Sequence, residues 1–153
     1  TSALSSIISK CKKYKIREGL DVVIVDYLQL VSIGSNKGTR EQEVAKVVRT
    51  LKNLAKELKI VVIALSQLSR KIDGREGNKI PVLGDLRESG EIEQAADVVI
   101  FLHRKNYYNL DTMDEFVHDT DIVVAKGRNV GTGKTNSLFI PSMTKFCDEY
   151  QNK

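Results

Sequence analysis

The chain has 153 residues, 41% hydrophobic and 29% charged, which suits one domain with a packed core and leaves little room for two. Its net charge of +4 mildly favours a polyanionic partner such as DNA or a nucleotide, although an ordinary basic soluble domain would carry the same charge. No apolar run approaches the roughly 20 residues of a membrane span, and Thr1–Lys13 lacks the order of a signal peptide, so we expect a cytoplasmic protein without a membrane partner.

The first half of the chain predicts helices alternating with buried strands. Apolar residues at helical spacing indicate a helix over Ser2–Arg17. The continuous β-branched run Leu20–Asp26 is typical of a strand buried on both faces of a parallel sheet. A glycine-containing loop, Ser32–Gly38, leads to an amphipathic helix over Arg40–Leu58 and then to a second buried strand, Ile60–Leu65. A strand–helix–strand unit of this kind requires a parallel pair of strands.

The second half is less regular. Ser69–Gly84 is a long polar loop, Glu91–Ala96 a short helix, Asp97–His103 a third strand and Asn106–Thr120 an irregular segment. Later strands are predicted over Asp121–Ala125, Ser137–Ile140 and Thr144–Cys147. The expected fold class is therefore α/β, with a central, mainly parallel sheet flanked by helices and a β-hairpin near the C-terminus.

An aspartate ends the first predicted strand, in the run Val22-Val23-Ile24-Val25-Asp26. Its carboxylate would lie at the C-terminal edge of a buried parallel strand, where open α/β sheets bind ligands. In nucleotide hydrolases an aspartate at this place holds magnesium, directly or through a water molecule. The alternative is an aspartate that caps a helix or begins a loop.

Polar residues also end the second strand, where Ser66 and Gln67 follow Ile63-Ala64-Leu65. They would reach the same sheet edge as Asp26. A glutamine there can hydrogen-bond a γ-phosphate or the attacking water, and can report its presence to the loop that follows. A solvent-exposed strand end with no ligand is the alternative.

Two cations, Lys126 and Arg128, follow the predicted strand Asp121–Ala125. Alternate positions on an extended chain project the same way, so both could reach a phosphate in a neighbouring subunit; a solvated basic turn is the alternative. The nearby Gly131–Thr135 (Gly-Thr-Gly-Lys-Thr) looks like the end of a phosphate-binding loop, but the full pattern needs a glycine where Arg128 stands. A strand-like segment also follows where a helix is required. We interpret it as a turn between strands.

The segment Asp85–Gly90 contains an arginine, Arg87, close to a glycine at the end of a long basic loop. This composition suits close approach to a nucleic-acid backbone. The same segment can instead begin a helix with Ser89 as its cap, and the two interpretations are compatible.

Cysteines and histidines give no sign of a metal site. Cys11 and Cys147 are isolated in the sequence, which fits reduced thiols. His103 and His118 have no ligand-like neighbours, so we expect structural or surface roles for them.

Taken together, the motifs resemble the bacterial and phage replicative helicases of the DnaB type. The matching segments, in the family's order, are Val25-Asp26-Tyr27-Leu28-Gln29-Leu30, Ala64-Leu65-Ser66-Gln67-Leu68-Ser69-Arg70, Asp85-Leu86-Arg87-Glu88-Ser89-Gly90, Ile92-Glu93-Gln94, Ala96-Asp97-Val98-Val99 and Ala125-Lys126-Gly127-Arg128-Asn129. The resemblance implies a RecA-like P-loop NTPase core, of which residues 1–153 would be the C-terminal portion of a single domain, from the Walker B strand onward.

The same resemblance implies a ring hexamer that binds ATP, or another nucleoside triphosphate, with Mg²⁺ between its subunits. Such a ring encircles single-stranded DNA, translocates along it and separates the duplex. By position, Asp26 would be the Walker B aspartate that holds the metal, through a water molecule. Gln67 would sense the γ-phosphate and couple it to the DNA-binding loops.

Two further sets of residues acquire roles from the resemblance. Lys126 and Arg128 would be a basic pair, including the arginine finger, that reaches the neighbouring subunit's nucleotide. Arg87, Glu88 and Gly90 would lie on the loop that touches the DNA phosphates.

In such helicases the Walker A loop, the catalytic glutamate and the N-terminal domain that recruits primase lie upstream of the position of Thr1. We therefore expect a parent protein that is an ATP-dependent DNA helicase, with primase and a helicase loader as partners of absent regions, and a chain that alone neither hydrolyses ATP nor unwinds DNA. Gly127 stands where the family often has a larger polar residue. The alternatives are another RecA-like DNA-dependent ATPase of recombination or repair, which the Asp85–Gly90 and Ile92–Val99 segments disfavour, and a degenerate, non-catalytic assembly module.

Overall fold

The computed structural model describes residues 2–34, 38–77, 79–86, 90–104 and 117–148. The chain divides into two compact units. The first combines Thr1–Gly74 with Gly84–Ala96, and the second combines Arg75–Leu83 with Asp97–Lys153. No helix within the described ranges is both long enough and apolar enough to cross a membrane.

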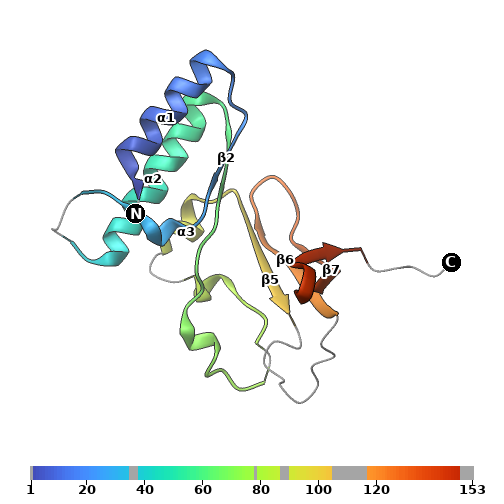
Figure 1. Cartoon of the computed structure of the whole chain (residues 1–153). Coiled ribbons are helices and arrows are strands. Elements are labelled where there is room, and N and C mark those ends of the chain that lie inside the picture. The colour runs from blue at the N-terminus through green and yellow to red at the C-terminus, as the bar shows by residue number, and fades with distance from the viewer. Residues whose placement is uncertain (1, 35–37, 78, 87–89, 105–116, 149–153) are drawn as a thin grey trace. The chain divides into compact units, whose positions relative to one another are not determined.

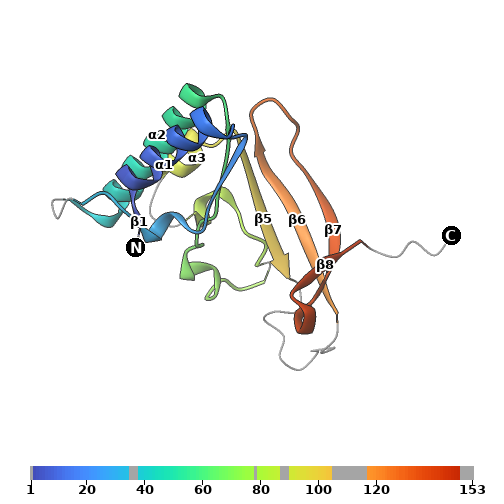
Figure 2. The same ribbon diagram turned by 45° about the horizontal axis from the view of Figure 1, so that its top comes forward.

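Two helices of the first unit, α1 (Leu4–Arg17) and α2 (Arg40–Leu58), lie side by side (Figures 1 and 2). The bounds of α2 are those that its apolar periodicity predicts, and its apolar stripe buries Val44, Val47, Leu51 and Leu54. The helix begins at a capping box: Thr39 and Gln42 each accept a hydrogen bond from the other's backbone N–H. This reciprocal pair fixes where the helix starts.

The predicted parallel pairing is confirmed. Strands β2 (Val22–Val25) and β4 (Val61–Ala64) pair in parallel, from Val22 opposite Val61 to Val25 opposite Ala64. A second parallel pair joins β1 (Ser2–Ala3) to β3 (Val31–Ser32). Between β2 and β4 the chain passes through α2, which supplies the crossover that parallel strands need.

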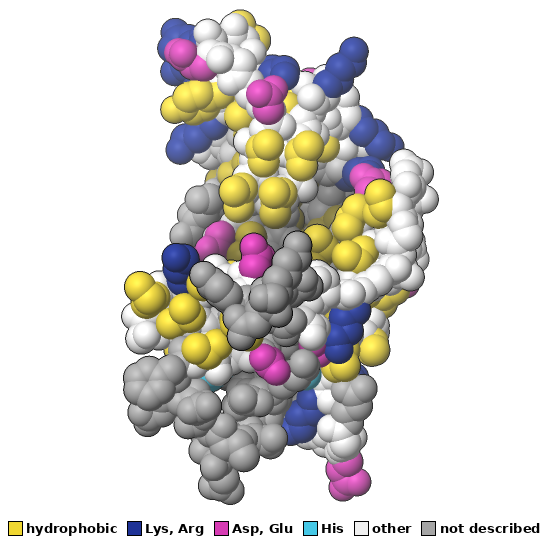
Figure 3. Space-filling view, turned by 90° about the vertical axis from the view of Figure 1, so that its right-hand side faces the viewer, with side chains coloured by type: hydrophobic (Ala, Val, Ile, Leu, Met, Phe, Trp, Pro, Cys, Tyr) yellow, Lys and Arg dark blue, Asp and Glu magenta, His cyan; other side chains and the backbone are white. Residues whose placement is uncertain are grey.

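The expectation that these strands are buried on both faces is wrong for this chain. One face contributes Val25 to the core that α1 and α2 share, whereas on the other face Ile24 is 67% exposed and Ile63 is 49% exposed. Apolar side chains gather on the side of the molecule shown in Figure 3. Among the residues that the structure describes, only one face of each strand therefore packs against the core.

The polar loop predicted over Ser69–Gly84 has ends that meet. Leu68 forms an isolated bridge with Leu86, and the N–H of Ser69 donates to the carbonyl of Asp85 at 2.8 Å. Short 3-10 helices cover Arg70–Ile72 and Leu83–Asp85. The predicted short helix is confirmed as α3 (Gly90–Ala95).

The second unit contains a four-stranded antiparallel sheet in the order β5-β6-β7-β8. Its strands are β5 (Val98–Arg104), β6 (His118–Gly127), β7 (Gly133–Ile140) and β8 (Lys145–Cys147). The α/β class is confirmed, but the antiparallel part is larger than the single hairpin expected at the C-terminus. Since β7 begins at Gly133, the segment that resembles a phosphate-binding loop leads into a strand, as predicted.

The segment expected to be irregular, Asn106–Thr120, is partly strand. β6 begins at His118, and residues 106–116 lie outside the described ranges. The strand predicted from Asp121 begins three residues earlier, and its start is hidden because the buried residues there are polar: His118 and Thr120 are 5% and 0% exposed. Burial of polar groups usually requires partners, and the Thr120 hydroxyl has one, since it donates to the His118 carbonyl at 3.3 Å.

Candidate functional site

The ends of β2 and β4 form the candidate site. Val25 and Ala64 are the last paired residues of the two strands, so Asp26 leaves the sheet at the same edge as Ser66 and Gln67. Backbone bonds continue the pairing beyond the strands: the N–H of Leu65 donates to the Val25 carbonyl, and that of Leu28 to the Leu65 carbonyl, both at 2.9 Å. The structure thus brings together the polar strand ends that the sequence predicts.

Asp26 itself is exposed at this edge, and the peptide bond that joins it to Tyr27 is cis. Gln67 is likewise exposed, whereas Ser66 is half-buried, so a carboxylate and an amide face solvent along this edge, with a hydroxyl on the residue before Gln67. Oxygen donors of this kind suit Mg²⁺, which usually takes one or two protein carboxylates and keeps several waters.

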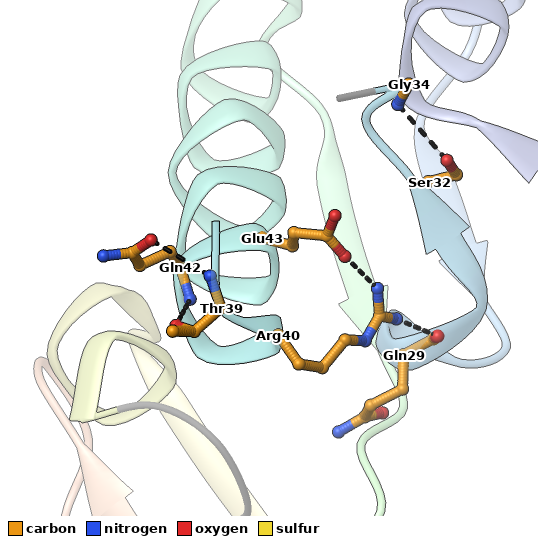
Figure 4. Close-up of polar contacts among 7 residues, drawn as sticks. All are labelled: Gln29, Ser32, Gly34, Thr39, Arg40, Gln42 and Glu43. Carbon is orange, nitrogen blue, oxygen red and sulfur yellow. Dashed lines mark hydrogen bonds and ion pairs between the residues drawn. The ribbon is translucent and has the colours of Figure 1, made fainter. Parts of the chain in front are cut away.

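One residue that sequence reasoning missed connects the two strand ends. Gln29, in the 3-10 helix Leu28–Leu30, donates from Nε2 to Ser66 Oγ at 3.1 Å and accepts from the N–H of Gln67 at 3.4 Å. Its backbone carbonyl accepts a hydrogen bond from the guanidinium of Arg40, at the start of α2 (Figure 4). In the sequence, this residue is visible only as a polar amide between two leucines, Leu28 and Leu30.

The second unit carries Lys126 and Arg128 at the end of β6. Lys126 is half-buried and pairs with Val99 across the sheet. Arg128 is exposed, its N–H donates to the Asp97 carbonyl at 2.8 Å, and its guanidinium lies 3.3 Å from the Asp97 carboxylate. The arginine is thus neither buried nor free, because its own chain supplies a carboxylate.

Gly127, between the two cations, is in close contact with the turn that follows. A Cβ at this position would lie 2.3 Å from the carbonyl oxygen of Val130 and 2.7 Å from Cγ2 of the same residue. The turn that connects β6 to β7 therefore requires a glycine here.

The proposed DNA-binding residues are only partly described. Arg87 and Glu88 lie outside the described ranges, and Gly90 is the first residue of α3. Just before them, Asp85 is 5% exposed, and its carbonyl accepts from Ser69. The segment that leads to Arg87 thus starts from a fixed point in the first unit.

A separate polar cluster, also missed from the sequence, lies on the four-stranded sheet. The buried carboxylate of Asp121 lies 2.8 Å from Lys134 Nζ and 3.6 Å from Nδ1 of His103. His118 is 5% exposed. The histidines therefore have structural positions rather than surface ones, and the lysine of the apparent phosphate-binding loop has an ion-pair partner within its own sheet.

Known proteins resemble this chain along almost its whole length. Residues 1–148 match the family described as the DnaB-like helicase C-terminal domain. The replicative DNA helicase DnaB of Geobacillus stearothermophilus is 45% identical over 146 residues, which are 95% of this chain and 32% of that protein. The replicative DNA helicase DnaC of Bacillus subtilis is 43% identical over the same shares. The chain spans about a third of the length of these relatives.

Solved structures agree with the sequence relatives. A DnaB-like replicative helicase, solved in a study of its interactions with primase, matches with a TM-score of 0.86 and 35% identity, over 97% of this chain and 36% of its own. A second solved chain, an ATPase domain, gives the same TM-score and identity over 97% of this chain and 52% of its own. The RecA-like fold expected from the motifs is therefore confirmed for a partial domain. By sequence and by structure, this chain belongs to the DnaB-like helicase C-terminal domain family.

Proposed function

We propose that this chain is part of the ATP-driven motor of a hexameric replicative DNA helicase, which translocates on single-stranded DNA and separates the duplex. One observation supports this most strongly: Asp26 and Gln67 follow the ends of two parallel strands that pair in register. That edge is where open α/β sheets bind their ligands. Membership of a replicative helicase family points to the same activity.

ATP, or another nucleoside triphosphate, would bind with Mg²⁺ at this edge. Asp26 would hold the ion, through a water molecule, and a bound Mg²⁺ neutralises charge that develops on the β- and γ-phosphates. The side-chain amide of Gln67 has both a donor and an acceptor. It would contact the γ-phosphate or orient the attacking water, and so report the nucleotide's state to the loop after β4.

Lys126 and Arg128 would act on the nucleotide of a neighbouring subunit. Arg128 is already exposed and held by a carboxylate, and a guanidinium binds a phosphate in the same bidentate manner as a carboxylate. It would exchange Asp97 for the neighbour's γ-phosphate when the ring assembles. The requirement for two subunits makes turnover depend on the hexamer.

DNA would be contacted from the segment that includes Arg87, Glu88 and Gly90, through backbone phosphates and without sequence preference. Primase and a helicase loader would bind regions outside this chain, in the cytoplasm. The sequence contains no complete phosphate-binding loop. We therefore propose that the isolated chain neither hydrolyses ATP nor unwinds DNA.

A chimera tests the proposal directly. This chain replaces the matching 146 residues of the Geobacillus helicase, and ATP hydrolysis and unwinding of a forked duplex are measured. The chimera should be active, and Asp26→Asn should abolish both activities. Asp21→Asn is the matched control, since Asp21 precedes β2 at its opposite end. Full turnover by the Asp26 variant, or turnover by the isolated chain, would contradict the proposal.

A further inference from the structure

Gln29 is placed to control the conformation of the segment that carries Gln67. Its side chain uses both ends of the amide across the strand edge: the nitrogen donates to Ser66 Oγ at 3.1 Å, and the oxygen accepts from the N–H of Gln67 at 3.4 Å. These contacts join residues 37 and 38 positions apart in the chain. Few side chains offer a donor and an acceptor at this spacing, so an apolar residue of the same length could not replace it.

The backbone of Gln29 is connected to the helix layer through Arg40. The guanidinium of Arg40 donates to the Gln29 carbonyl and lies 2.5 Å from Oε2 of Glu43, one turn further along α2 (Figure 4). A cation in the first turn of a helix is disfavoured by the helix dipole. The positive charge at this position is therefore best explained by its contacts, with Glu43 offsetting the charge and the Gln29 carbonyl accepting from the other side.

Helix α2 provides a rigid support for this connection. Val44 and Val47 in the turns after Arg40 are 1% and 0% exposed, and the capping box of Thr39 and Gln42 fixes the first turn. A close-packed core transmits small displacements rather than absorbing them. A shift of the Gln67 segment would thus be felt at the start of α2, and the reverse.

We propose that Gln29 is a positioning residue: it holds the Ser66–Gln67 segment at the sheet edge and connects it, through Arg40, to the start of α2. This inference rests on the proposed function, because the purpose of the connection is to aim Gln67 at a γ-phosphate. Gln29 itself touches neither nucleotide nor metal in this scheme. Its loss lowers the rate of turnover and the stimulation of turnover by DNA, and leaves nucleotide binding in place.

The experiment uses the same chimera with the Geobacillus helicase. Gln29→Met keeps the length of the side chain and removes both polar ends. It should lower kcat, and its stimulation by single-stranded DNA, by about tenfold, the effect of one or two lost hydrogen bonds. The affinity for a fluorescent ADP and the KM for ATP should stay near those of the parent. Ser66→Ala should act in the same direction, and the double variant should be no worse than Gln29→Met, because the two residues form one contact.

Asn53→Leu is the matched control, since it removes an exposed amide from α2 and leaves the capping box, Gln29, Ser66 and Gln67 untouched. A merely structural role for Gln29 would lower the Tm of Gln29→Met and leave its kcat as unchanged as that of the control. If Gln29→Met keeps the parental kcat while Gln67→Ala loses turnover, the inference about Gln29 is overturned and the proposed function is not. Parental turnover in Gln67→Ala would overturn the proposed function instead. If Gln29→Met does not fold, Ser66→Ala decides: an unchanged kcat there overturns the inference.

Discussion

Asp97 holds Arg128 twice, by its carbonyl, 2.8 Å from the arginine N–H, and by its carboxylate, 3.3 Å from the guanidinium. The backbone contact fixes where the arginine leaves the sheet. The side-chain contact is between groups that are 51% and 55% exposed, and ion pairs of this kind contribute little in water. The fold therefore fixes the backbone of Arg128 firmly and its guanidinium only weakly.

Replacing the carboxylate should cost little stability. Asp97→Asn keeps the backbone carbonyl and removes only the charge, so the free energy of unfolding should fall by less than about 1 kcal/mol. Urea denaturation of the isolated chain measures this. The matched control is Glu57→Gln, which removes the charge from another exposed ion pair, with Lys12 at 2.7 Å. A loss of several kcal/mol in Asp97→Asn alone would show that the pair is a structural lock.

Gly127 should be intolerant of any side chain. In Gly127→Ala the new Cβ meets the Val130 carbonyl at 2.3 Å, and relieving such a contact costs about 1–3 kcal/mol. A lower Tm in thermal unfolding is the expected result. Gly131→Ala is the control, because nothing lies within 4 Å of a Cβ there. Equal Tm values for the two variants would mean that the Val130 carbonyl does not lie against Gly127.

The two faces of β2 and β4 should respond differently to truncation. Ile24 is 67% exposed and Leu51 is 3% exposed. Ile24→Ala should change the free energy of unfolding by less than about 0.5 kcal/mol, whereas Leu51→Ala should cost about 2–5 kcal/mol. Urea denaturation of the isolated chain compares them. A large loss in Ile24→Ala would show that this face is covered in solution.

Local patterns were sufficient to predict α2 and the common edge of Asp26 and Gln67. The apolar period of the helix predicts its bounds, and parallel strands with a helical crossover must end at one edge. The helix follows from interactions between near neighbours in the chain, and the common edge follows from the topology of the crossover. The exposure of Ile24 could not be predicted from local patterns, since a strand covered on one face and a strand covered on both can have the same β-branched sequence.

Contacts between distant segments could not be predicted from the sequence. The bonds from Gln29 to Ser66 and Gln67 depend on how two strand ends face each other, and the close approach of Val130 to Gly127 depends on the path of one turn. The start of β6 at His118 was missed because its buried residues, His118 and Thr120, are polar, and it is their pairing with β7 that makes them part of the strand. A polar sequence predicts a loop unless the partner strand is known.

The two thiols should differ in reactivity. Burial raises the pKa of Cys11, whereas Cys147 is partly exposed. A thiol that keeps its proton in the folded state stabilises the fold fully below the unfolded pKa of about 8.5, and this contribution is lost as the pH rises through the folded pKa. A colorimetric disulfide reagent at pH 8 should label Cys147 first and Cys11 only after urea is added. Equal rates in the native chain would contradict the burial of Cys11.

Nucleotide turnover by Arg128→Ala in the chimera tests the motor interpretation most directly. Hydrolysis by the proposed motor requires one subunit to provide Asp26 and Gln67 and its neighbour to provide Arg128. Arg128→Ala should therefore bind fluorescent ADP as tightly as the parent and lose turnover by about 10³-fold or more. Adding Asp26→Asn subunits, which retain Arg128, should restore part of that turnover in mixed rings. Parental turnover in Arg128→Ala, or a failure to bind nucleotide, would contradict the assignment.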